Sequence, residues 1–197
     1  MSRARALWAR LSRAERVALA GLAVLLAAGI ALRVVTMLAY RPAFIGYPDT
    51  REYALGADGE LFADPFRTVG YPFFLRLLHL VTDHLSFVVV VQHALGIATA
   101  LLLVGAVRRA GAPAWAGLLP AAVILLGGDQ LLFEHAVLTE TLYAFLTVAA
   151  LYAGVRCLDG SRLAWPALAG VLLGLAATVR ISGLPLVALL VAWMPLV

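Results

Sequence analysis

Residues 47–78 read YPDTREYALGADGELFADPFRTVGYPFFLRLL, the one long polar stretch in a chain that is otherwise mostly apolar. Its acidic residues are Asp49, Glu52, Asp58, Glu60 and Asp64, and its arginines are Arg51, Arg67 and Arg76. We expect this stretch to lie in a single extracytoplasmic loop, residues 41–85, between the first two membrane spans. We also expect any chemistry of the protein to begin in this loop, with the rest of the chain as its scaffold.

The composition indicates a membrane protein. Of the 197 residues, 63% are hydrophobic and 13% are charged, and the mean hydropathy is +0.97. Soluble globular domains are about half apolar and about a quarter charged. A soluble domain of this size cannot bury so many apolar side chains, so we expect an all-α fold, a polytopic bundle of transmembrane helices. The single cysteine, Cys157, excludes an internal disulfide and a paired-cysteine metal site.

The apolar runs predict five to six spans. The five expected in full are residues 17–40, 86–107, 114–127, 136–155 and 163–179. A sixth begins at Leu184 and has about 14 residues, whereas a span usually needs about 20. We therefore expect the chain to be the N-terminal part of a longer protein, or a truncated product. Arg33 lies inside the first span, where we expect its guanidinium to snorkel toward the outer interface.

The distribution of charge predicts the orientation. Nine of the 15 arginines fall in three segments expected inside: residues 1–16, 107–113 and 156–162. Nine of the 11 acidic residues fall in two segments expected outside: residues 41–85 and 128–140. Because arginine accumulates in cytoplasmic segments, we expect a multi-pass protein of the inner or plasma membrane, with a basic cytoplasmic N-terminus at 1–16 and a transmembrane domain at 17–197. Acids gathered on one side also count against a nucleic-acid partner.

Short patterns predict local structure. Ser12 and Glu15 have the spacing of a capping box before the first apolar run. Within the outer loop, residues 51–55 can be helical and residues 57–64 resemble a turn. Residues 71–80 have the pattern of a helix lying on the membrane surface, with a proline suited to its first turn, and Arg76 is expected to snorkel from it.

Carboxylates and arginines are expected at the same membrane face. Asp49 and Glu52 are three residues apart, so they share a face of a helix. Arg67 follows in the same loop, while Glu140 and Arg180 stand at the outer ends of two later spans. A carboxylate can take a proton from a hydroxyl nucleophile, and an arginine can hold a phosphate through two hydrogen bonds.

Four segments resemble one family in their order along the chain. They are DTREYALGA at 49–57, RTVGYPFFL at 67–75, LTE at 138–140 and GLAATVRISGL at 174–184. They resemble the GT-C fold glycosyltransferases, most closely the protein O-mannosyltransferase and aminoarabinose transferase-like branch. That family has further spans and usually a soluble C-terminal portion.

The resemblance implies transfer of a sugar from a polyprenyl-phosphate donor to a hydroxyl of a lipid, glycan or protein acceptor, outside the cytoplasm and with inversion. It implies a catalytic Asp49, with Glu52 as a second candidate. It places Arg67 and Arg180 by the carrier phosphate and Glu140 in the ordering of the site. Tyr47, Tyr53 and Tyr71 are expected to stack on the sugar or to mark the interface. No cofactor is required.

Simpler interpretations stand beside these. Asp49 can be a solvated loop acid, Glu52 a partner of Arg51, and Arg67 a member of a loop salt bridge. A divalent cation is a further option, because His79, His84, His93 and His135 lie in the outer half near Glu134, although their spacing matches no ligand motif. The whole chain can be a non-catalytic membrane module that binds a lipid-linked sugar or partners. A transporter is a weaker option, since it predicts charges at mid-membrane.

Overall fold

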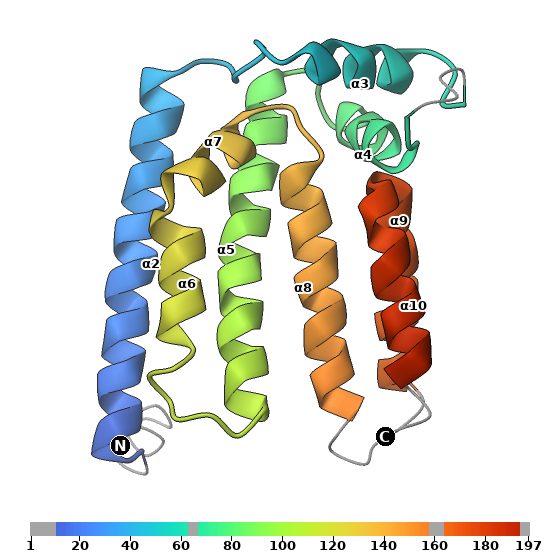
Figure 1. Ribbon diagram of the computed structural model, residues 1–197. Coiled ribbons are helices and arrows are strands. Elements are labelled where there is room, and N and C mark those ends of the chain that lie inside the picture. Colours follow the sequence, from blue (N-terminus) through green and yellow to red (C-terminus); the bar gives the residue numbers. More distant parts are fainter. Residues whose placement is uncertain (1–10, 63–66, 158–163, 194–197) are drawn as a thin grey trace.

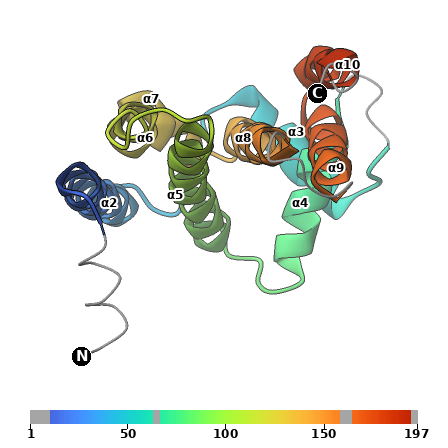
Figure 2. The ribbon, with the colours of Figure 1, turned by 90° about the horizontal axis from the view of Figure 1, so that it is seen from below.

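The computed structural model describes residues 11–62, 67–157 and 164–193, which fold into helices with no strand among them. The helices are α2 (Arg13–Ala39), α3 (Pro48–Asp58), α4 (Gly70–His79), α5 (Leu85–Arg109), α6 (Leu118–Leu126), α7 (Gly128–His135), α8 (Glu140–Cys157), α9 (Ala164–Val179), the short 3₁₀ helix η1 (Ile181–Gly183) and α10 (Leu184–Trp193). The helices α2, α5, α6, α8, α9 and α10 run roughly parallel or antiparallel, and α3 and α4 lie over one end of them (Figure 1 and Figure 2). The predicted all-α fold is confirmed for these residues.

Two helices are long and apolar enough to cross a membrane. They are α2 with 27 residues and α5 with 25, which at about 1.5 Å per residue exceed the roughly 30 Å of bilayer hydrocarbon. The helices α6 and α7 qualify together as a third span, bent by 55° at their junction. The helices α8 and α9 have 18 and 16 residues. By length and composition, neither alone qualifies as a membrane span.

The predicted capping box starts α2. The Ser12 hydroxyl accepts a hydrogen bond from the backbone N–H of Glu15 at 3.2 Å, and the Glu15 carboxylate accepts one from the backbone N–H of Ser12 at 2.9 Å. This reciprocal pair satisfies donors that the first turn of a helix leaves free, and it fixes where the first long helix begins.

The segment after α6 differs from the prediction. Residues 128–140 were expected to be an outer loop, but Gly128–His135 form α7, which folds back against the bundle. The backbone of Gly127 is extended at the junction, and a Cβ there would lie 2.5 Å from the carbonyl oxygen of Val123. Glycine therefore permits a bend that places Glu134 and His135 in the interior, each with no exposed surface.

Arg33 also differs from the prediction, because it does not snorkel. Only 3% of the surface of Arg33 is exposed. One guanidinium nitrogen donates to the carbonyl oxygens of Gly29 and Leu125 at 3.0 Å each, and the other donates to Glu134 at 2.6 Å. The carboxylate and the carbonyls left free at the end of α6 hold the charge inside the bundle.

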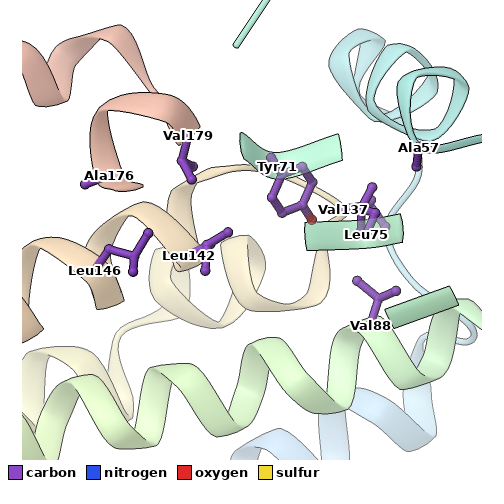
Figure 3. Packing of buried hydrophobic residues seen from close by; sticks show 9 residues of the cluster. All are labelled: Ala57, Tyr71, Leu75, Val88, Val137, Leu142, Leu146, Ala176 and Val179. Carbon is purple, nitrogen blue, oxygen red and sulfur yellow. The ribbon is translucent and has the colours of Figure 1, made fainter. Parts of the chain in front are cut away.

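The main hydrophobic cluster lies beneath the loop helices. Tyr71 and Leu75 of α4 pack against Val88 of α5, Leu142 of α8 and Val179 of α9 (Figure 3). All five are buried, and they come from four different helices. Burying an aliphatic side chain of this size contributes about 1.5–3 kcal/mol. This cluster therefore fastens α3 and α4 to the bundle.

Both helices predicted in the outer loop are present. The first, α3, extends through Asp58, so the expected turn at 57–64 begins later than predicted. Arg76 of α4 has partners on α3: its Nε donates to the carbonyl oxygen of Ala57 at 2.9 Å, and another nitrogen donates to that of Gly59. These are carbonyls at the C-terminal end of α3, where a cation is favoured. Arg76 thus joins the two loop helices.

Candidate functional site

Five of the predicted site residues meet at one end of the bundle: Tyr53 and the four charged residues that follow. Asp49 lies in the first turn of α3 and Arg67 precedes α4, while Glu140 begins α8 and Arg180 follows α9. These four line one hollow of about 450 Å³. Figure 1 shows α3 and α4 over this end of the bundle. The hollow is also lined by Tyr53, Thr68, Thr139, Val179, Ile181 and Ser182.

The first ion pair joins Asp49 to Arg67. The Nη1 atom of Arg67 lies 2.6 Å from Oδ1 of Asp49, with side chains 32% and 53% exposed. Pro48 occupies the first position of α3, where its missing N–H is no loss, and the carboxylate of Asp49 sits at the positive end of the helix. The pair remains accessible to a ligand because about half of the carboxylate surface faces solvent.

The second ion pair joins Glu140 to Arg180. The Nη1 atom of Arg180 lies 2.5 Å from Oε1 of Glu140 and also donates to the hydroxyl of Thr139 at 3.0 Å. The two side chains are 32% and 39% exposed. The carboxylate stands in the first turn of α8, again at the positive end of a helix dipole. Each carboxylate of the hollow thus has its own guanidinium.

Contacts between α4 and α9 close the site. The hydroxyl of Thr68 donates to the carbonyl oxygen of Val179 at 2.6 Å. Gly70 approaches so closely that a Cβ on it would lie 2.6 Å from the backbone of Thr178. A side chain at position 70 would therefore push the outer loop away from α9 and separate Arg67 from Arg180.

Tyr53 forms part of the wall between the ion pairs. Its ring lies 5.9 Å from the guanidinium carbon of Arg67 and packs edge-on against Tyr71, with ring centroids 5.1 Å apart. Burial raises the pKa of Tyr53, and the nearby carboxylates of Asp49 and Glu140 add to the increase, although a hydrogen bond to Thr139 and the charge of Arg67 oppose it. The phenol therefore stays protonated at neutral pH and can donate a hydrogen bond.

Tyr71, for which the sequence predicts a substrate-binding role, does not line the hollow. It has no exposed surface, and its hydroxyl donates to Oε1 of Gln92 at 2.8 Å. Gln92 in turn donates to the carbonyl oxygens of Glu134 and Ala136. Tyr71 therefore supports the wall from behind through its contact with Tyr53.

Glu52 is also outside this hollow. It forms an exposed pair with Arg51 at 3.6 Å and lines a neighbouring hollow of about 470 Å³ between α3 and α4. The two hollows share Tyr53, Arg67 and Thr68. Asp49 and Glu52 are three residues apart on α3, but they line different hollows and do not share one site as their spacing predicts. Tyr47, which ends the segment before α3, lines neither hollow.

Glu134, His93 and His135, which the sequence groups as a possible cation site, lie in a buried polar cluster whose pairing with Arg33 and Gln130 was not predicted. Glu134 accepts hydrogen bonds from Arg33 at 2.6 Å and Gln130 at 2.9 Å, and His93 Nδ1 lies 2.8 Å from its other oxygen. His135 lies beyond His93, their nearest ring nitrogens 3.4 Å apart. The available signal was the pair Gln92-His93 in the middle of an apolar helix, since polar residues there need partners.

The described residues contain no group of three or more histidine, cysteine, aspartate or glutamate side chains placed to hold a metal ion. In the candidate site, the two carboxylates can accept protons or hydroxyl hydrogens, and the two guanidinium groups can bind an anion. Comparison of the chain with family models, with curated proteins and with solved structures finds no match.

Proposed function

We propose that the protein is a membrane glycosyltransferase of GT-C type that transfers a sugar from a polyprenyl-phosphate donor to an acceptor hydroxyl, with inversion. The observation that carries this proposal is the shared hollow of Asp49, Arg67, Glu140 and Arg180. It offers carboxylates and guanidinium groups side by side. Sugar transfer from a phosphate needs a proton acceptor for the incoming hydroxyl and cations for the departing phosphate.

In the proposed reaction the acceptor oxygen attacks the anomeric carbon from the face opposite the phosphate. The new carbon–oxygen bond forms as the bond to the phosphate oxygen breaks, and polyprenyl phosphate leaves with both bonding electrons. Asp49 takes the proton of the acceptor hydroxyl. Arg180 and Arg67 hold the phosphate through charge-assisted hydrogen bonds, and Glu140 keeps Arg180 oriented toward the hollow.

The proposal includes a membrane arrangement with the candidate site outside the cytoplasm. We propose that α8, α9 and α10 cross or enter the bilayer beside α2, α5 and the bent α6–α7 pair, giving five to six spans in the cell membrane. The arginine-rich ends of α2, α5 and α8 lie opposite the candidate site (Figure 1). By the preference of arginine for cytoplasmic ends, the N-terminus is cytoplasmic.

The test is the Asp49→Asn variant of the full-length protein in proteoliposomes, with a panel of radiolabelled polyprenyl-phosphate sugars and membrane extract as the acceptor source. Loss of a general base lowers turnover by about 10²–10⁴-fold. Asp83→Asn is the matched control. Asp83 is an exposed acid just before α5, at the same end of the bundle as Asp49, and it lines neither hollow. Equal turnover of the wild type and Asp49→Asn would refute the proposed base.

A non-catalytic role in binding a lipid-linked sugar uses the same hollow. The two functions differ in outcome: a binding module retains the radiolabelled lipid without transferring its sugar, and Asp49→Asn then changes no rate. An enzyme releases free polyprenyl phosphate in step with glycosylated acceptor. Measuring both products in one assay therefore separates the two functions.

A further inference from the structure

We propose that a groove between α5 and α8 holds an acyl chain of an anionic glycerophospholipid whose phosphate binds at Arg156. The groove lies in the half of the bundle away from the candidate site, toward the arginine-rich end. The inference is therefore independent of the proposed sugar transfer, and the failure of one leaves the other intact.

The groove is a hollow of about 420 Å³ on the outside of the α5–α8 contact. It is lined by Ala98, Leu101, Leu102, Gly105, Phe145 and Tyr152. Small residues create the depression: a Cβ on Gly105 would lie 2.9 Å from the ring of Tyr152. The lining is hydrocarbon and aromatic carbon along its length, and the hydroxyl of Tyr152 is its polar end.

Arg156 lies one helical turn beyond that polar end. Its Nη1 donates to the hydroxyl of Tyr152 at 3.4 Å, and its guanidinium stacks over the ring of Trp165 at 4.2 Å. The Nε of Arg156 is buried and has no hydrogen-bond partner within the described part of the chain. No carboxylate among the described residues forms an ion pair with Arg156. Arg109, which ends α5, also interacts with the hydroxyl of Tyr152.

These features fit an amphiphile with one charged end. The apolar lining alone selects nothing in a membrane, because lipid tails are as apolar as leucine. Selection comes from the cation at the end of the groove, which favours a phosphate that carries a net negative charge. A zwitterionic lipid offers the same chains, but its ammonium group offsets that attraction. An anionic glycerophospholipid in the leaflet at the arginine-rich end matches both the apolar lining of the groove and the cation at its end.

The experiment uses the purified full chain in detergent, titrated with palmitoyl-oleoyl-phosphatidylglycerol or with the phosphatidylcholine of the same chains, and native mass spectrometry as the readout. One arginine at the membrane surface contributes a preference of about five-fold. We expect the anionic lipid to bind at least that much more tightly and Arg156→Gln to remove the difference. Arg16→Gln, an exposed arginine at the same end on α2, leaves the preference unchanged.

Two further variants separate binding from folding. Arg156→Lys keeps the charge and the stem, so it retains part of the preference even if Arg156→Gln unfolds. Ala98→Phe fills the groove and weakens binding of both lipids at this site. Equal affinity for the two lipids, an equal loss in Arg16→Gln and Arg156→Gln, or binding that Ala98→Phe does not weaken would each overturn the proposal. The proposal would also be overturned if a protein helix displaced the bound lipid from the groove.

Discussion

Arg33 and Glu134 are 101 positions apart in the chain, and in the structure their side chains form a 2.6 Å ion pair with almost no exposed surface. The pair joins the first long helix to the short helix that folds back after Gly127. Since an unpaired charge in such a place is strongly unfavourable, each residue depends on the other. The pair therefore fixes the bent α6–α7 segment against α2.

Breaking this pair is expected to destabilise the fold. Glu134→Gln keeps the size of the side chain but leaves the charge of Arg33 without a counterion, and removing one partner of a buried pair costs about 3–5 kcal/mol. The double variant Arg33→Met, Glu134→Leu removes both charges and is expected to recover much of the loss. The stability of both variants is measured by thermal unfolding of the purified protein in detergent, with circular dichroism as the readout. A double variant less stable than Glu134→Gln would contradict this expectation.

Gly96 makes room for the carboxylate of Glu134. A Cβ at position 96 would lie 1.8 Å from Oε1 of Glu134, so Gly96→Ala must displace the buried pair. Such overpacking costs about 1–3 kcal/mol. Gly170→Ala on α9 is the matched control, since its Cβ would meet nothing within 4 Å. The unfolding temperature of Gly170→Ala should equal that of the wild type or exceed it slightly.

Arg180 is expected to act on the donor phosphate. Arg180→Gln removes a charge-assisted hydrogen bond of about 1.5–3 kcal/mol, which corresponds to a loss of roughly 10–150-fold in kcat/KM for the polyprenyl-phosphate donor. Arg180→Lys keeps the charge and should restore part of the activity. Arg41→Gln, an exposed arginine outside both hollows, is the control. A donor kcat/KM unchanged in Arg180→Gln would show that the phosphate binds elsewhere.

Tyr71 links the stability of the outer loop to alkaline pH. Burial raises the pKa of Tyr71 well above its usual value of 10.0. Above pH 10 the unfolded chain loses this proton while the folded chain keeps it, so stability is complete below pH 10 and falls as the pH rises further. Tyr71→Phe removes the buried hydrogen bond and lowers stability at neutral pH by about 1–3 kcal/mol. Its unfolding temperature should fall less steeply than that of the wild type between pH 10 and 11.5.

The proposed orientation can be tested with the single native cysteine. Cys157 ends α8 at the arginine-rich end, whereas Asp83 is an exposed residue at the opposite end, before α5. In intact cells a membrane-impermeant maleimide is expected to label Asp83→Cys in a Cys157→Ser background. Wild-type Cys157 should react only after permeabilisation. Labelling of both positions from the same side would rule out the multi-pass arrangement.

The sequence predicted the helices of the outer loop because their signals are local. Pro72 in the first turn of α4 acts within one helical turn, as does the capping box at Ser12 that begins α2, so their effect can be predicted without knowing the fold. The meeting of Asp49, Arg67, Glu140 and Arg180 depends on which ends of the helices point the same way. The distribution of charge and the number of spans indicate which helix ends share a side. They do not indicate which carboxylate pairs with which arginine.

The course of the chain after α6 was not predicted because its cause is non-local. GGDQLLFEH has the polarity of a loop, and it forms a helix because Glu134 finds Arg33 and His93 on two distant helices. Arg33 was expected to snorkel for the same reason, since only the tertiary fold shows a buried carboxylate beside it. Arg76 likewise finds carbonyls at the end of α3 that its own sequence context does not reveal.

The hydrogen bond from Thr68 to the carbonyl of Val179 spans 111 positions, and this separation has a consequence for biosynthesis. At about 5–20 residues per second, translation needs roughly 6–22 s to pass from one residue to the other. By the end of that interval the loop and the α5 and α8 parts of its docking surface have been made, but the part that α9 provides has not. A nascent chain halted before α9 would carry Asp49 and Arg67 without the helix that seats them, which leaves this loop open to membrane proteases and chaperones.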